Sequence, residues 1–331
     1  MSLIQKSWPV FIYAITISAE SILIEFLTTS LRLSPLLLSA ASITIGGLML
    51  LLAKVFLGKR DERIPLRKSV VIFSQSTKNL MFASLALAIG VFAWYDSIGR
   101  VGASKEVILA GPLEVVLILL LARIILKEAL DKVHVLGCIV AIIGFFIAVL
   151  SSVNSIDTLH KSTMTILSYG DIEAIVSAIG FAVAVLFLTK LVSAHAPVEV
   201  AGATLFLAGL VIFGFLILFY FDKIGSISEL TKSKAAITLG ILILFSFLPF
   251  IGALSYAVGL GKIGAALTGT IGASSILITL AAQILLREFG IMRSHVPENI
   301  IFAILGGVLG FMGIVIVHTH NYYFSATRKK P

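Results

Sequence analysis

The sequence contains a single cysteine, Cys138, among 331 residues, which excludes an internal disulfide and a cysteine-based metal cluster. Charged residues are also scarce, at 13%, whereas 59% of the residues are hydrophobic. A soluble domain needs a polar outer shell, and a chain with a mean hydropathy of +1.10 has too few polar residues to build one. The composition therefore predicts a protein whose outer surface faces lipid.

Several catalytic and nucleotide-binding sequence motifs are also absent. The sequence has no P-loop, no His-Glu-x-x-His motif and no Gly-x-Ser-x-Gly motif, so nothing in it indicates ATP hydrolysis or a hydrolase. The net charge of +8 does not indicate nucleic acid, because the cations stand singly or in short clusters between apolar runs. We predict no catalytic residue, no metal, no cofactor and no nucleic-acid partner.

Long apolar runs are what the sequence has in abundance. A membrane-spanning helix needs about 20 mostly apolar residues, and the runs of this length predict an all-α membrane protein with ten transmembrane helices. Tight joints, such as the one before Pro35 and the one at Gly261-Lys262, make neighbouring helices antiparallel. The predicted spans are residues 8–31, 33–54, 79–98, 102–125, 133–153, 171–190, 198–221, 235–261, 263–286 and 299–319.

The third to fifth runs resemble the eighth to tenth. Gly137 and Gly144 are seven residues apart, and so are Gly306 and Gly313. Because each copy belongs to a unit of five helices, an odd number, the second unit must lie inverted in the membrane. We predict two inverted five-helix repeats, residues 1–155 and 168–321, and a cytoplasmic tail, residues 322–331. Other anchors match in the same order: Tyr95 with Tyr256, Gly102-Ala103 with Gly264-Ala265, Gly111 with Gly272, and Leu126-Lys127-Glu128 with Leu286-Arg287-Glu288.

The order Gly102-Ala103, Gly111-Pro112, Lys127-Glu128, Leu136-Gly137 and Gly144 resembles the EamA family of the drug/metabolite transporter superfamily. The resemblance extends over both halves of the chain, and it implies metabolite transport by alternating access, often coupled to an ion. The sequence departs from the family pattern in two places. The proline expected in the ninth span is absent near Gly272-Ala273, and Glu114 stands where an apolar residue is expected.

Glu20 and Glu114 interrupt predicted spans at depth. Each lies twelve residues from one end of its span, or ~18 Å of helix, which places both near the middle of a hydrocarbon core of ~30 Å. A carboxylate there is costly unless it is paired, hydrated or protonated. We interpret both as candidate substrate- or proton-binding residues; the alternative is a buried acid that hydrogen-bonds a neighbouring helix. The run from Tyr13 to Glu20 also resembles the first span of the small multidrug resistance transporters.

Other polar and aromatic residues are weaker candidates. Trp94, Tyr95 and Tyr256 either line a cavity mouth or form an interfacial aromatic belt, with the belt favoured for Trp94. Ser275, in an unusually polar ninth span, either contacts substrate or joins helices. Glu25 lies ~7.5 Å beyond Glu20 and about 140° around the helix, so we expect it near the outer surface, paired with Arg100 or Lys105.

The leading hypothesis is a secondary transporter that moves a small metabolite or drug-like molecule by alternating access, coupled to a proton or cation, with export as the expected direction. The alternatives are a membrane-embedded enzyme acting on lipid, and a channel. The expected partners are a small-molecule substrate and the lipid bilayer, for a monomer or homodimer. The expected location is the plasma membrane.

Lys and Arg predominate in the segments that an arrangement with a cytoplasmic N-terminus places inside, above all residues 58–78 and the tail at Arg328-Lys329-Lys330. Because positive loops stay in the cytoplasm, both termini are predicted to be cytoplasmic. Reporter domains fused after residue 60 and at the C-terminus are expected to give cytoplasmic signals. An external signal from either fusion would contradict the predicted topology.

Overall fold

The computed structural model describes residues 3–57, 66–121, 123–124, 132–151, 167–192, 194–224, 232–291, 297 and 299–328. These residues are overwhelmingly helical and none of them forms a strand, so the predicted all-α class is confirmed. The anchor Lys127-Glu128 lies outside the described residues.

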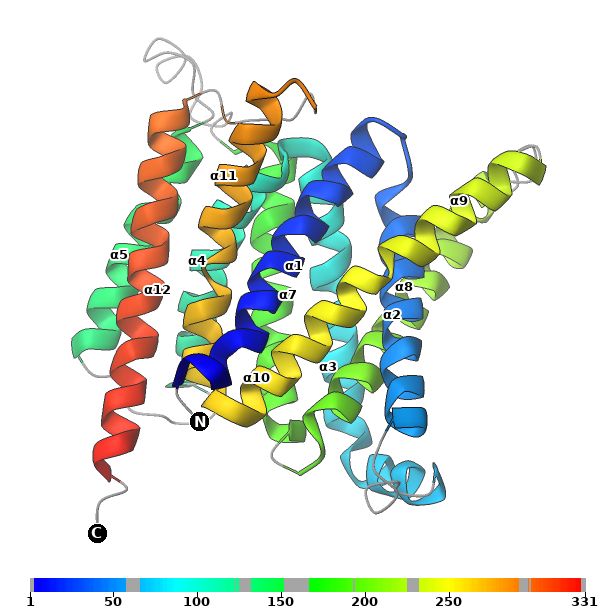
Figure 1. The fold of residues 1–331 in the computed structure, drawn as a ribbon, viewed down its shortest axis with the longest axis horizontal. Coiled ribbons are helices and arrows are strands. Elements are labelled where there is room, and N and C mark those ends of the chain that lie inside the picture. Colours follow the sequence, from blue (N-terminus) through cyan, green and yellow to red (C-terminus); the bar gives the residue numbers. More distant parts are fainter. Residues whose placement is uncertain are drawn as a thin grey trace.

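The helices form a bundle in which most axes run between two opposite ends (Figure 1). The helix α1 begins and α12 ends at the same end, which we call the N-terminal face; the opposite end is the far face. The first half of the chain forms α1 (Leu3–Thr29), α2 (Pro35–Leu57), α3 (Leu66–Val101), α4 (Ala103–Leu121) and α5 (Lys132–Leu150). The second half forms α7 (Tyr169–Val192), α8 (Pro197–Ile224), α9 (Lys232–Phe245), α10 (Phe247–Gly272), α11 (Ser275–Glu288) and α12 (Ile300–Arg328).

Within the described residues, eight helical segments are long and apolar enough to cross a bilayer. The fourth and ninth predicted spans are not among them. The reason for the fourth is charge, since α4 carries Lys105, Glu106 and Glu114 within 19 residues. The reason for the ninth is continuity, because its residues are divided between the end of α10 and the 14-residue α11.

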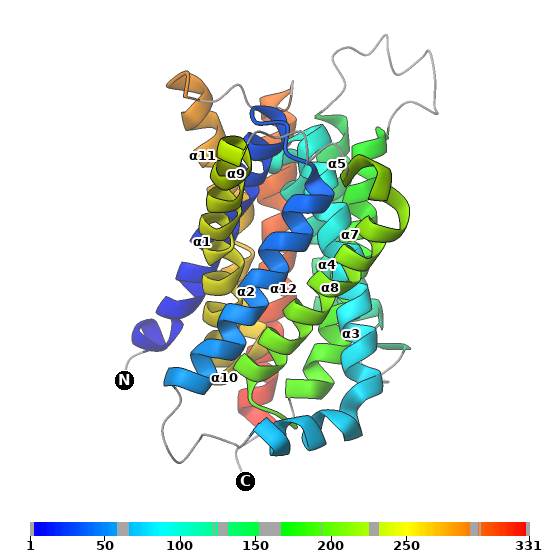
Figure 2. The ribbon, with the colours of Figure 1, turned by 90° about the vertical axis from the view of Figure 1, so that its right-hand side faces the viewer.

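Two helices differ from their predicted bounds. The helix α3 has 36 residues, far more than the predicted 79–98, and its first turns lie across the N-terminal face before the rest crosses the bundle (Figure 2). The predicted joint at Gly261-Lys262 is helical. However, a Cβ on Gly259 would lie 3.3 Å from Thr268 Oγ1, whereas nine residues of straight helix rise ~13.5 Å. The chain therefore turns back within α10 without losing its helical assignment.

Small residues bring pairs of helices into backbone contact. A Cβ on Gly144 of α5 would lie 2.8 Å from the carbonyl oxygen of Gly306 in α12, and one on Gly306 would lie 2.8 Å from the nitrogen of Ala148. Along this seam residue numbers rise in α5 as they fall in α12, so the two helices are antiparallel. Only glycine fits where backbones approach this closely.

Three other antiparallel pairs complete the bundle. The helices α3 and α7 meet at Gly90 and Gly180, where a Cβ on Gly180 would lie 2.6 Å from Gly90 Cα. The helices α2 and α8 meet where Gly47 faces the backbone of Phe206, and α1 meets α10 where Tyr13 packs on Tyr256 at 5.0 Å between ring centroids. A turn at Gly102, with φ +86°, separates α3 from α4, a conformation that side chains disfavour.

The α5–α12 seam generates a stability prediction. Gly144→Ala places a methyl group against the backbone of α12, so the helices must move apart, and the expected cost is about 1–3 kcal/mol of unfolding free energy. Gly240→Ala in α9 is the matched control, since a Cβ there meets nothing within 4 Å. Thermal unfolding of the purified protein in detergent should show a lower midpoint for Gly144→Ala only. Equal midpoints for the two variants would contradict the packing described here.

Candidate functional site

A cavity of about 530 Å³ lies inside the bundle. Its walls come from α1, α3, α4, α7, α8, α10 and α11, with single contributions or pairs from α2 and α12. A volume of this size suits a small organic molecule rather than a bare ion. Most lining side chains are apolar, so the polar ones among them determine what the cavity can recognise.

Three carboxylates line this cavity: Glu20 of α1, and Glu106 and Glu114 of α4. No Lys, Arg or His is among the lining residues that the structure describes. Charge in such surroundings is stabilised only by hydrogen bonds, water, protons or a cationic ligand. The electrostatics of the cavity therefore favour positive species.

Glu20 is buried, and its Oε1 accepts a hydrogen bond of 2.7 Å from the hydroxyl of Tyr95 in α3. The Tyr95 hydroxyl lies 3.1 Å from Ser42 Oγ of α2. Because the single hydroxyl proton of Tyr95 points to Glu20, Ser42 is the donor in the second contact. Tyr95 itself stands behind Glu20 and is not among the lining residues, although the sequence marked it as a cavity candidate.

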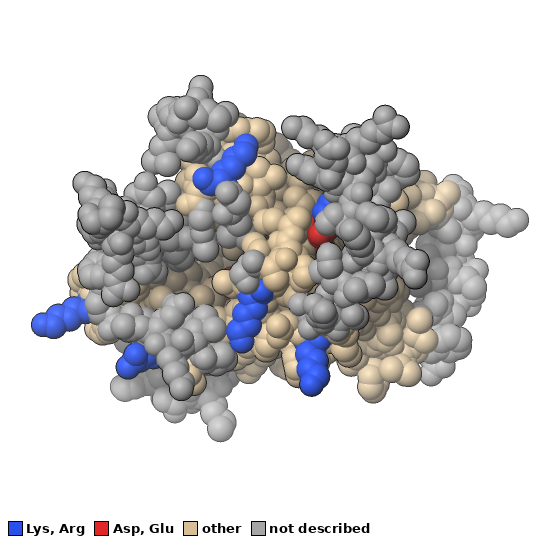
Figure 3. All heavy atoms as spheres, turned by 90° about the horizontal axis from the view of Figure 1, so that it is seen from below, with Lys and Arg blue, Asp and Glu red and all other residues tan. Residues whose placement is uncertain are grey.

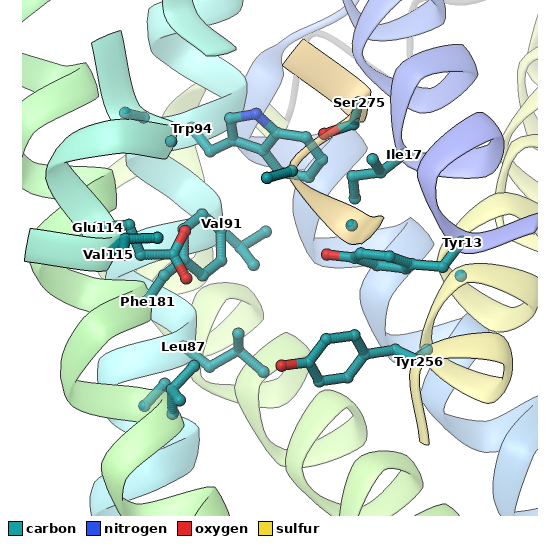
Figure 4. A pocket seen from close by; sticks show the side chains of 18 of the residues that line it. Tyr13, Ile17, Leu87, Val91, Trp94, Glu114, Val115, Phe181, Tyr256 and Ser275 are labelled. Carbon is teal, nitrogen blue, oxygen red and sulfur yellow. The ribbon is translucent and has the colours of Figure 1, made fainter. Parts of the chain in front are cut away.

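Glu114 faces Tyr13 and Tyr256 across the cavity, and both tyrosine hydroxyls point toward it (Figure 4). Tyr13 comes from α1 and Tyr256 from α10, and their rings tilt at 50° to each other. Among the described residues Glu114 has no hydrogen-bond or ion-pair partner. Its carboxylate is thus available to a ligand.

Glu106 was not singled out from the sequence. It is 1% exposed, accepts a hydrogen bond of 3.1 Å from Ser177 Oγ, and has Trp94 as a second hydrogen-bonding partner. Glu106 stands beside Lys105 close to the start of a predicted span, where charged side chains usually lie at the membrane–water interface. The one available signal was the run of two charges inside an otherwise apolar segment.

Trp94 and Ser275 also line the cavity (Figure 4). Trp94 is 7% exposed, so the aromatic-belt interpretation favoured for it is wrong: its indole packs against Tyr95 and Phe181 inside the bundle. Ser275 begins α11, and its carbonyl oxygen accepts a 3.2 Å hydrogen bond from Ser18 Oγ of α1. This contact joins the two halves of the chain beside the cavity.

Toward the far face the cavity ends at a polar layer. Glu25 is fully buried and its Oε2 accepts hydrogen bonds from the Ala103 backbone N–H, at 2.8 Å, and from the Gln283 side chain. Gln283 Oε1 in turn accepts from the Ser104 backbone N–H at 2.8 Å. This layer joins α1, α4 and α11 and satisfies N–H groups at the start of α4, which would otherwise lack partners.

The expected position of Glu25 near the outer surface is therefore wrong. The two basic residues expected beside it form ion pairs elsewhere: Lys105 Nζ lies 2.5 Å from Asp171 Oδ1, and Arg100 binds Asp96 and Glu173. The Arg100–Glu173 pair joins the far end of α3 to α7, and the Lys105–Asp171 pair joins the far end of α4 to α7. They reinforce the closed end of the cavity next to the Glu25 layer.

At the N-terminal face Lys54 near the end of α2 pairs with Glu199 near the start of α8, but the described residues that line the cavity form no hydrogen-bonded layer like that of Glu25. The cavity lining extends to Thr189 near the end of α7, Ala201 near the start of α8 and Leu119 near the end of α4, and Thr189 is exposed. Lys and Arg dominate the charged side chains visible on this face (Figure 3). Exposed basic residues near these helix ends are Arg123 after the end of α4, Lys132 at the start of α5 and Lys190 near the end of α7.

A lipid-facing bundle that encloses an acidic cavity indicates a multi-pass membrane protein that admits small molecules. Residues 8–150 match the family model of the EamA-like transporter family, which is part of the drug/metabolite transporter superfamily. The resemblance seen in the motifs is thereby confirmed over these residues, and the eight apolar helices together with this match indicate an integral, multi-pass membrane protein.

A comparison with curated proteins finds no match. A solved structure titled "Crystal structure of protein" is similar over 100% of both chains, with a TM-score of 0.57 and 17% sequence identity. At this identity the likeness concerns the fold alone. It extends over the second half of the chain, which the family model does not reach.

The sealed and open ends of the cavity can be compared by cysteine labelling. In a Cys138→Ala background, Thr189→Cys should react readily with a water-soluble, membrane-impermeant methanethiosulfonate reagent, because Thr189 is exposed at the N-terminal face. Ser104→Cys should be protected, because Ser104 is fully buried behind the Glu25 layer. Labelling is measured by mass spectrometry; similar rates at both positions would show that the far end is not closed.

Proposed function

We propose that this chain moves a small organic molecule across the bilayer by alternating access, with Glu20 as the residue that exchanges a proton or binds a coupling cation. The observation that carries the proposal is the shape of the cavity. Its lining reaches the N-terminal face, and at the other end a hydrogen-bonded layer closes it. A cavity closed at one end describes one of the two states that alternating access needs, and it does not describe a continuous pore.

Reciprocal contacts support the inverted repeat. Gly137 and Gly306 are equivalent anchors, and Ala148 and Val317 follow them by eleven residues each. Gly137 packs against Val317, and Gly306 packs against Ala148, so the two contacts exchange when the repeats are exchanged. Since α5 and α12 are equivalent helices and run antiparallel, these contacts support an axis of symmetry in the membrane plane.

The contacts between α2 and α8 support the inverted repeat independently, because they also exchange when the repeats are exchanged. Gly47 packs against Phe206, and Gly209 packs against Thr44. Thr44 precedes Gly47 by three residues, as Phe206 precedes Gly209. Repeats related in this way supply two states of similar energy, because each half can adopt the conformation now held by the other. The second state would open the Glu25 layer and close the N-terminal face.

Coupling follows from the environment of Glu20. Its carboxylate lies in the cavity wall with Tyr95 as a hydrogen-bond donor, and no basic side chain lines the same cavity among the described residues. Moving such a group between two sides is easier when a proton or a cation neutralises it. With both termini cytoplasmic, as the basic N-terminal face favours, protons entering from outside would drive export through the plasma membrane.

Glu20→Gln keeps the size and hydrogen-bonding capacity of the side chain but removes its exchangeable charge. The variant should fold, since a neutral amide is no harder to bury than a protonated acid. In proteoliposomes with an imposed pH gradient, accumulation of substrate should fall to the level of protein-free vesicles, whereas exchange of labelled for unlabelled substrate should persist. The substrate is the compound that most stabilises the protein in a thermal screen of amino acids, sugars, nucleotides and organic cations.

Glu288→Gln is the matched control, because Glu288 is exposed at the end of α11 and lies outside the cavity. It should transport as the unaltered protein does. Gradient-driven accumulation by Glu20→Gln at the same rate as by Glu288→Gln would remove Glu20 from the coupling mechanism.

A further inference from the structure

The three cavity acids differ in how well the protein already satisfies them. Glu20 accepts a hydrogen bond from Tyr95, and Glu106 accepts one from Ser177. Glu114, in contrast, has no hydrogen-bond or ion-pair partner among the described residues, although it faces the cavity. A carboxylate held in apolar surroundings without a partner is costly, and a cationic ligand is the species that removes this cost.

The wall opposite Glu114 is suited to the same kind of ligand. Tyr13 and Tyr256 present two hydroxyl oxygens and two ring faces to the cavity, and their centroids are 5.0 Å apart (Figure 4). Tyrosine hydroxyls accept hydrogen bonds from ammonium groups, and aromatic faces attract cations within about 6 Å. Phe181 and Trp94 extend the aromatic lining toward α3 and α7.

The lining also excludes other classes of substrate. An anionic metabolite, or the carboxylate of an amino acid, would find no Lys, Arg or His among the described lining residues. A metal ion alone would leave most of the cavity unfilled, at about 530 Å³.

We propose that the substrate of this cavity is an amphipathic organic cation, an amine with an apolar or aromatic body, whose ammonium group binds between Glu114 and the Tyr13–Tyr256 pair. The proposal rests on the proposed transport function and adds the substrate class. It also divides the work between two acids: Glu114 binds the substrate and Glu20 couples its movement.

Three probes of similar size separate the possibilities. The compound 2-phenylethylamine carries an ammonium group, 2-phenylethanol is its neutral counterpart, and L-phenylalanine adds a carboxylate to the amine. Binding to the purified full-length protein in detergent is measured by isothermal titration calorimetry at pH 7. The amine should bind at least about 10-fold more tightly than either of the other two, as a charge-assisted hydrogen bond provides.

Glu114→Gln should weaken amine binding by about 10- to 100-fold and abolish the preference for amine over alcohol. Glu20→Gln should retain that preference, and so should the exposed control Glu288→Gln. Tyr256→Leu is a second variant that leaves every acid in place; it should reduce the preference by removing one aromatic face. Thermal unfolding of each variant confirms that it is folded before titration.

Three results would overturn the proposal: no binding of the amine to the unaltered protein, equal affinity for amine and phenylalanine, or an unchanged amine preference in folded Glu114→Gln. These results are separate from a failure of the transport function. Proteoliposomes that accumulate a different compound would retain alternating access without this substrate class. An amine that binds through Glu114 but never crosses the bilayer would retain the site and refute transport.

Discussion

The placement of carboxylates inside an apolar bundle is the constraint on which the site depends. An acid that cannot reach water must find a donor, a proton or a cation, and each buried glutamate here meets this requirement differently. Glu25 accepts hydrogen bonds from the start of α4 and from Gln283, and so closes one end of the cavity. Glu20 and Glu106 accept hydroxyl hydrogen bonds from neighbouring helices. Glu114 is left to the cavity.

The same constraint explains why the fourth and ninth predicted spans are not among the segments that are long and apolar enough to cross a bilayer. The helix α4 exceeds the usual charge content of a membrane helix because it carries two of the cavity acids, and the region of α10 and α11 is interrupted beside Ser275. These segments occupy equivalent places in the predicted repeat, and both line the cavity. Departures from simple apolar helices therefore coincide with the site, where binding energy has to come from polar groups.

Depth along a helix could be calculated from the sequence, and the two residues that it singled out, Glu20 and Glu114, both line the cavity. The sequence did not reveal which helices pack around each of these side chains. Glu25 and Glu106 lie near helix ends, where a sequence predicts interface and water, yet α4, α7 and α11 pack around them. The aromatic-belt interpretation of Trp94 was wrong for the same reason. A tryptophan at the end of a span faces either lipid or protein, and only the packing of α3 against α7 determines which. The seven-residue spacing of Gly137 and Gly144, and of Gly306 and Gly313, could be read from the sequence, and these glycines form the α5–α12 seam.

The α5–α12 seam has a mechanical consequence. The two backbones touch over several turns, and α5 contributes no side chain to the described cavity lining. Separating these helices would expose peptide groups and sacrifice close packing without widening the passage of a solute. A rearrangement that shifts access from one side of the membrane to the other can therefore leave the α5–α12 pair as a rigid unit. The helices that carry the acids would then tilt relative to this pair.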